Sequence, residues 1–149
     1  MEINEATCPT LNAYGIRTKD SMEAMGKYIM QLFKDMRKHK LHFAGTVFSV
    51  YYEKPVEGQP CDYEMAATVK ESANNNMLVK TYGGGKALHM TVKGSYKNLA
   101  PAYNEMNAYI DKNKIEKIGP PIEIYTRGPI LGMIMIPFLL VTDIYFPVK

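Results

Sequence analysis

The chain has 149 residues, of which 46% are hydrophobic and 22% charged, a composition typical of one globular domain rather than a disordered or fibrous protein. Eighteen Lys and Arg against fifteen Asp and Glu give a net charge of +3, too mild by itself to indicate nucleic-acid binding. The two cysteines, Cys8 and Cys61, form neither a disulfide framework nor a zinc-ligand spacing. We therefore expect a cytoplasmic protein with no metal, no cofactor and no direct nucleic-acid partner.

The two halves of the chain repeat one pattern of apolar, turn and cap positions. An offset of 74 aligns Gly45 with Gly119, Tyr51 with Tyr125, and Pro55 with Pro129. After five extra residues in the second half, residues 63–70 align with 142–149 at an offset of 79. We interpret the chain as two copies of one unit of roughly 70 residues, about 1–73 and about 74–149.

Within each copy the hydrophobic period changes from that of strands to that of a helix and back. Strands are predicted at 2–6, 11–17, 46–52, 63–70, 77–82, 87–93, 122–126 and 142–148. The helices are predicted to begin near Ser21 and Ser95, which can cap their first turns, and each carries an apolar stripe typical of a core-facing side. Residues 77–92 are predicted to form a hairpin around three glycines, because the GGGK there lacks the spacing of a phosphate-binding loop.

These elements predict an α+β fold in which a ββαββ unit is duplicated with pseudo-twofold symmetry. We expect a mostly antiparallel, curved, eight-stranded sheet. Both helices should lie on one face of it, because that arrangement buries both apolar stripes.

One acidic residue lies within an apolar strand of the second copy. Alternation along IEIYT puts Glu123 and Tyr125 on the same face, and the equivalent strand of the first copy offers Ser49 and Tyr51. A carboxylate is costly to bury without a partner, so Glu123 either faces solvent or is held for a cation, and both alternatives stay open here. Tyrosines around one acid can hold flat cations by stacking, cation–π attraction and counter-charge, and Tyr145 alternates similarly near the C-terminus.

Three motifs stand in order in the second copy: Gly94-x-Tyr96-x-x-Leu99, Pro121-x-Glu123-x-Tyr125, and Thr142-Asp143-Ile144-Tyr145-x-Pro147-Val148. At these spacings, within a duplicated ββαββ chain, they resemble the GyrI-like (gyrase-inhibitor-like) small-molecule-binding domain. The same domain is the effector-binding module of AraC-type and MerR-type bacterial transcription regulators. The resemblance covers essentially residues 1–149.

The resemblance implies a central ligand pocket near the pseudo-twofold axis, which in relatives takes up bulky, often cationic aromatic compounds. In those relatives an acidic residue at the Glu123 position supplies the counter-charge. This chain departs from the pattern in having an apolar segment where relatives are polar or acidic, and Ser49 where its second copy has Glu123. The ligand-binding residues expected from the motifs and the alternation are Glu123, Tyr125, Tyr51, Ser49, Tyr145 and Tyr96.

We therefore expect a stand-alone binding protein for bulky, amphipathic aromatic molecules, above all cations. One alternative is a hydrolase that detoxifies reactive electrophilic compounds, as some relatives do, with Glu123 and a nearby Tyr as the catalytic candidates. Another is a gyrase-inhibitor-type protein-interaction module. No helix-turn-helix segment is found, so any role in gene regulation would require a separate regulator chain as partner.

The longest apolar run, Ile130–Val141, has twelve residues, whereas a helix needs about 20 to span a bilayer, so no membrane span is expected. Left exposed, this run would form a larger apolar patch than monomers normally tolerate. We expect it either to form a homodimer interface or to fold over the pocket mouth.

Overall fold

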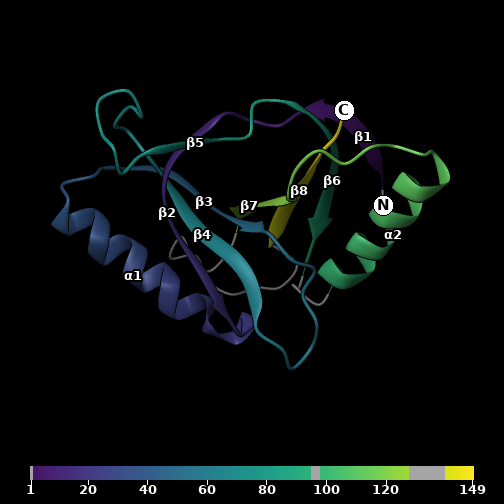
Figure 1. Cartoon of the computed structure of the whole chain (residues 1–149), viewed down its shortest axis with the longest axis horizontal. Coiled ribbons are helices and arrows are strands. Elements are labelled where there is room, and N and C mark those ends of the chain that lie inside the picture. The colour runs from purple at the N-terminus through teal and green to yellow at the C-terminus, as the bar shows by residue number, and fades with distance from the viewer. Residues whose placement is uncertain (1, 95–97, 128–139) are drawn as a thin grey trace. The chain divides into compact units, whose positions relative to one another are not determined.

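The computed structural model of the chain describes residues 2–94, 98–127 and 140–149 (Figure 1). These residues form eight strands, two α-helices and a short 3-10 helix, η1. In chain order the elements are β1 (Ile3–Thr7), β2 (Leu11–Asp20), η1 (Met22–Ala24), α1 (Met25–Lys38), β3 (Phe43–Tyr51), β4 (Cys61–Val69), β5 (Lys80–Tyr82), β6 (Lys86–Lys93), α2 (Leu99–Lys112), β7 (Ile122–Arg127) and β8 (Val141–Pro147). The predicted α+β class and the repeated ββαββ order are confirmed.

The chain forms two compact units, each with one helix and four strands. Unit 1 consists of the residues up to Pro9 together with Gly84–Lys149, and unit 2 is Thr10–Gly83. Neighbouring strands pair antiparallel in the order β1-β6-β8-β7 in unit 1 and β3-β4-β2-β5 in unit 2.

In unit 1, α2 packs on one face of the sheet, here called the helix face. The apolar stripe of α2 buries Ala102, Met106 and Ile110 at helical spacing. They pack against alternate residues of β6, β8 and the position that follows β8: Leu88, Met90, Val92, Ile144, Phe146 and Val148. Because side chains alternate along a strand, the intervening residues lie on the opposite face of the sheet. Among these are His89 and Asp143.

In unit 2, α1 lies along β2 and β4 and covers the corresponding helix face (Figure 1). Leu32 and Met36 of its apolar stripe are buried. The Tyr28 ring of α1 meets the Tyr63 ring of β4 edge-on, with the ring centroids 6.2 Å apart. Tyr63 therefore points to the helix face, and Glu64 points to the opposite face.

The first strands of the two predicted repeats are exchanged between the units. β1 pairs with β6 in unit 1, and β5 pairs with β2 in unit 2. The hairpin predicted over residues 77–92 is therefore wrong. Its glycines redirect the chain: Gly83 and Gly84 have φ of 71° and 90°, which favour glycine. The Gly84 N–H donates to the Cys8 carbonyl at 3.0 Å, and the Cys8 N–H donates to the Gly85 carbonyl at 2.8 Å.

The predicted helix starts are only partly matched. Ser21 precedes η1 rather than α1, and its side chain makes no capping hydrogen bond. Instead the Ser21 N–H donates to the Asp20 carboxylate at 2.7 Å. Ser95 lies outside the described residues.

No helix in the described part of the chain is long and apolar enough to cross a membrane. The apolar run 130–141, predicted to be an interface or a cover, lies outside the described residues except for its last two positions.

Candidate functional site

Glu123 is a buried carboxylate on the helix face of unit 1. It lies directly opposite Ile144 in the β7–β8 register, so both side chains point towards α2. Only 2% of Glu123 is exposed. The Tyr103 hydroxyl of α2 donates to Glu123 Oε2 at 2.6 Å, and the Tyr125 hydroxyl donates to Oε1 at 3.0 Å.

The apolar stripe of α2 positions the Tyr103 hydroxyl. Leu99 and Tyr103 pack at the edge of the cluster that buries Met106, and the Tyr103 ring lies 5.5 Å from the Phe146 ring, centroid to centroid. The Glu123 carboxylate is thus shielded from solvent, and each of its oxygens accepts a hydrogen bond from a tyrosine hydroxyl. In such a site electrostatic attraction to a cation is stronger than at the surface.

The predicted ligand-binding residues are distributed over different faces. Tyr125 lies beside Glu123, as the alternation predicts. Ser49 and Tyr51 belong to β3 of unit 2, where both are buried and pair with Met65 and Tyr63 on the helix face of that unit.

Tyr145 does not lie beside Glu123 in the described structure. Tyr145 pairs with Ile122 and His89, which places it on the opposite face of the unit 1 sheet from Glu123. Its ring stacks on the His89 ring with centroids 4.7 Å apart. Tyr96 lies outside the described residues.

Asp143 is the centre of a polar cluster on this opposite face. Thr91 donates to Asp143 Oδ1 at 2.7 Å, His89 Nε2 lies 2.8 Å from the same oxygen, and Thr126 donates to Oδ2. Burial alone would raise the pKa of Asp143, but the hydrogen bonds from Thr126, Thr91 and His89 outweigh it and hold the pKa below its usual value.

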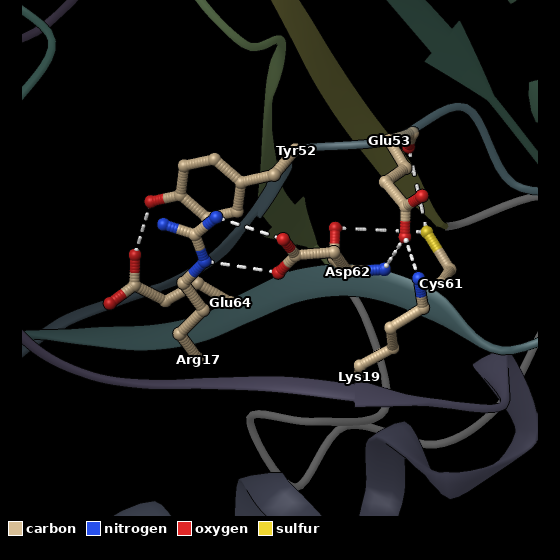
Figure 2. A network of polar contacts seen from close by, with 7 residues as sticks. All are labelled: Arg17, Lys19, Tyr52, Glu53, Cys61, Asp62 and Glu64. Atoms are coloured by element: carbon tan, nitrogen blue, oxygen red, sulfur yellow. Dashed lines mark hydrogen bonds and ion pairs between the residues drawn. The ribbon is translucent and has the colours of Figure 1, made fainter.

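Unit 2 carries an acid at the equivalent position. The offset of 79 aligns Glu64 with Asp143. Glu64 is 1% exposed and lies on the opposite face of its own sheet. The Tyr52 hydroxyl donates to Glu64 Oε1 at 2.6 Å, and the Tyr82 hydroxyl donates to Oε2 at 2.8 Å (Figure 2 shows the Tyr52 bond). Burial first, and then the neighbouring Glu64 carboxylate, raise the pKa of both phenols.

Tyr103 and Glu64 are not among the residues predicted from the sequence. Tyr103 reads as one more apolar-stripe residue, because periodicity does not show that its hydroxyl reaches a strand. The sequence does indicate that Glu64 is unusual, since it is the only charged residue in the run YEMAATV and aligns with Asp143 in the repeat.

A surface hollow of about 340 Å³ lies where β6 ends and α2 begins. The described residues that line it are Thr91, Val92, Lys93, Asn98 and Pro101, and none of them is a predicted ligand-binding residue. Glu123 is not among the described residues that line the hollow. No group of three or more His, Cys, Asp or Glu side chains in the described part of the chain could hold a metal ion.

The sequence profile of the GyrI-like small molecule binding domain matches residues 1–149. The chain belongs to the GyrI-like family. No curated protein matches it.

Solved structures of several proteins share the fold of this GyrI-like chain. The C-terminal domain of EcmrR has a TM-score of 0.80 at 20% identity, over 99% of this chain and 97% of that domain. The chain spans 57% of the EcmrR chain in the EcmrR–DNA complex. SAV2435 bound to tetraphenylphosphonium has a TM-score of 0.64 at 18% identity, over 100% of this chain and 94% of that one. A hydrolase from Listeria innocua has a TM-score of 0.65 at 11% identity, over 99% and 92%.

Proposed function

We propose that this GyrI-like chain binds bulky aromatic cations, with Glu123 as the counter-charge and Tyr103 and Tyr125 as neighbouring ring surfaces. The observation that carries the proposal is the burial of the Glu123 carboxylate between two tyrosine hydroxyls on the helix face of unit 1. The similar fold of SAV2435, whose structure holds tetraphenylphosphonium, supports the same ligand class.

Burial of the charged Glu123 carboxylate is costly, because the carboxylate loses its hydration. The two tyrosine hydroxyls that donate to Glu123 carry no formal charge. A cation that comes close gains Coulomb attraction in a site of low dielectric, and its rings gain contact with Tyr103 and Tyr125. A neutral aromatic of the same size gains only the second contribution.

Access to Glu123 requires a local rearrangement. Because the carboxylate is 2% exposed and Tyr103 donates to it from α2, a bulky ligand reaches Glu123 only when the Tyr103 side chain moves. The binding free energy is therefore reduced by the free energy of breaking the Tyr103–Glu123 hydrogen bond.

Titration of Glu123→Gln with a charged and a neutral ligand tests the proposal. Gln keeps the shape and removes the charge; it retains one acceptor oxygen, and its NH2 group can donate to the other tyrosine oxygen. Tetraphenylphosphonium should bind about tenfold more weakly, roughly 1.4 kcal/mol, whereas neutral triphenylphosphine oxide should be nearly unaffected. Folding stability should change little, and it rises if the charge is costly in the ligand-free protein.

Glu116→Gln is the matched control, because Glu116 is a surface residue of the same unit, 3.8 Å from Lys149. It should leave both affinities unchanged. Equal losses for the two ligands in Glu123→Gln, or no loss for either, would refute Glu123 as the counter-charge.

Hydrolysis of reactive electrophilic compounds is the second candidate. It is favoured by the 2.6 Å hydrogen bond between Tyr103 and Glu123, since a carboxylate and a phenol at this distance can exchange a proton with a bound substrate. Incubation with a reactive epoxide distinguishes the two functions. Product in large excess over protein supports hydrolysis, and full recovery of the epoxide, or its loss only by stoichiometric attachment to the protein, shows that there is no turnover.

Ligand binding by this chain could serve a sensory role. EcmrR has been solved with DNA, and this chain spans 57% of it. We propose that ligand binding by this chain is read out by a partner, either a separate regulator chain or a second copy of the chain. Light scattering with and without tetraphenylphosphonium tests the homodimer version.

A further inference from the structure

Arg17 of β2 places its guanidinium on an aromatic ring in unit 2 (Figure 2). The Arg17 Cζ atom lies 3.7 Å from the centroid of the Tyr52 ring. The guanidinium also donates to Asp62 through two parallel hydrogen bonds, Nε to Oδ1 at 3.0 Å and Nη2 to Oδ2 at 2.8 Å. The ring and the carboxylate thus hold one flat cation between them.

A second carboxylate, that of Glu64, accepts a hydrogen bond from the hydroxyl of the same ring. Tyr52 donates to Glu64 at 2.6 Å, and the Arg17 and Glu64 backbones are directly paired between β2 and β4. Glu64 is 1% exposed, and Lys80 Nζ lies 3.6 Å from its Oε2. The buried charge of Glu64 makes the Tyr52 ring more attractive to a cation, since the phenol donates its proton towards a carboxylate.

The cation in this arrangement is exchangeable. The Arg17 side chain is 53% exposed and that of Asp62 is 26% exposed. Exposed ion pairs contribute about 0–1 kcal/mol, and the bidentate geometry puts this pair at the upper end of that range, so the guanidinium can leave for solvent at a modest cost. The ring face and the Asp62 carboxylate remain when it leaves.

Unit 1 lacks this arrangement at the equivalent positions. The offset of 74 aligns Arg17 with Thr91 and Tyr52 with Thr126. Both threonines donate to Asp143 and present neither a cation nor a ring. The guanidinium on an aromatic face is therefore specific to unit 2 among the described residues.

We propose that Tyr52, Asp62 and Glu64 form a binding site for guanidinium-bearing small molecules, which Arg17 occupies as an internal substitute for the ligand. The planar fork of the ligand would take the two Asp62 oxygens, and its flat face would lie on Tyr52. The site lies in unit 2 and does not depend on the proposed role of Glu123.

Removal of the internal cation tests the site, with phenylguanidinium as the probe. Arg17→Ala should bind phenylguanidinium several-fold more tightly than the wild type, because the probe no longer competes with the tethered guanidinium. Lys19→Ala is the matched control. Lys19 is an exposed cation on the same strand, 3.2 Å from Glu53, and because it acts on Asp62 more weakly than Arg17 does, its removal should change the affinity much less than Arg17→Ala. Equal affinity in Arg17→Ala and Lys19→Ala would overturn the proposal.

Further variants in the Arg17→Ala background locate the site. Tyr52→Phe keeps the ring and should retain most of the gain, whereas Tyr52→Leu should abolish it. Gly15 lies very close to Glu64: a Cβ added at Gly15 would be 2.6 Å from Glu64 Oε2. The NMR signal of the Gly15 amide should therefore shift when the probe binds. A gain that survives Tyr52→Leu would refute the site.

Glu123→Gln separates this site from the one in unit 1. Added to Arg17→Ala, it should leave the gain for phenylguanidinium intact, even if tetraphenylphosphonium turns out not to bind near Glu123. Loss of the gain in this double variant would place the probe at Glu123 and overturn the proposal for unit 2.

Discussion

The Tyr103 hydroxyl of α2 lies 2.6 Å from the Glu123 carboxylate of β7. This hydrogen bond joins the helix of unit 1 to its sheet beside the apolar cluster of Met106 and Ile144. The bond has two consequences. It compensates part of the cost of burying Glu123, and it must break before a bulky ligand can touch the carboxylate.

Tyr103→Phe should therefore separate stability from affinity. The ring and its packing remain, but Glu123 loses one donor, so the free energy of unfolding should fall by about 1–2 kcal/mol. Tetraphenylphosphonium should bind several-fold more tightly, because the ligand no longer displaces that hydrogen bond. Urea denaturation and titration of the same preparation measure the two effects.

Tyr109→Phe is the control for the loss of a hydroxyl from α2, because Tyr109 is 37% exposed. It should change neither stability nor affinity. If Tyr103→Phe weakens both folding and ligand binding, the Tyr103 hydroxyl contacts the ligand rather than blocking it.

The element order could be predicted from the sequence because it depends on local periodicity. The helical stripe that contains Leu32 and Met36, and the alternation around Glu123, are both properties of neighbouring residues. This alternation places Glu123 and Tyr125 on the same face of the strand. The choice of Glu123 between solvent and a buried partner could not be decided, because the partner Tyr103 is 20 residues away in the sequence.

Strand pairing could not be predicted in the same way. The glycines at 83–85 are compatible with a hairpin that pairs β5 with β6, and equally with a turn after which the two strands pair with other partners. Only contacts between residues far apart in the sequence decide between these two outcomes. β5 pairs with β2, whereas β6 pairs with β1 and β8. Tyr145 shows the same limit, since alternation within β8 does not say which of its faces meets Glu123 of β7.

Tyr14 and Asp35 predict a pH-dependent contribution to stability in unit 2. The Tyr14 hydroxyl of β2 donates to Asp35 of α1 at 2.8 Å. Burial, and then this hydrogen bond, raise the pKa of Tyr14 to about 12. The same hydrogen bond is the main reason that the pKa of Asp35 lies below its usual value.

The two shifts act at opposite ends of the pH scale. The Asp35 contribution is present above its unfolded pKa of about 3.9 and is lost as the pH falls through its lower folded value. The Tyr14 contribution is present below its unfolded pKa of about 10 and is lost as the pH rises towards 12. Both require the Tyr14 hydroxyl.

Tyr14→Phe should therefore be less stable than the wild type by about 1 kcal/mol between roughly pH 5 and 9. The difference should shrink below about pH 4 and again above about pH 10. Urea denaturation of both proteins over this range gives the difference directly. A difference that stays constant from pH 3 to 11 would show that this hydrogen bond does not couple to either ionisation.

Gly15 and Gly26 offer a matched pair of Gly→Ala substitutions in unit 2. At Gly15 of β2 an added Cβ would lie 2.6 Å from Glu64 Oε2 and 2.7 Å from the Tyr82 hydroxyl. Gly15→Ala must therefore push apart the Glu64–Tyr82 hydrogen bond, which joins the short edge strand β5 to β4. At Gly26 of α1 an added Cβ would meet nothing within 4 Å.

Gly15→Ala should lower the free energy of unfolding by about 1–3 kcal/mol, because overpacking displaces a buried, hydrogen-bonded carboxylate. Gly26→Ala should raise it by about 0.5–1 kcal/mol, because alanine reduces the conformational freedom of the unfolded chain and fits a helix. Thermal and urea denaturation should therefore show changes of opposite sign in the free energy of unfolding, although both variants add the same methyl group. If Gly15→Ala is as stable as the wild type, the close approach of Glu64 to β2 does not constrain the sheet, and the Tyr52–Glu64–Tyr82 cluster is looser than its hydrogen bonds imply.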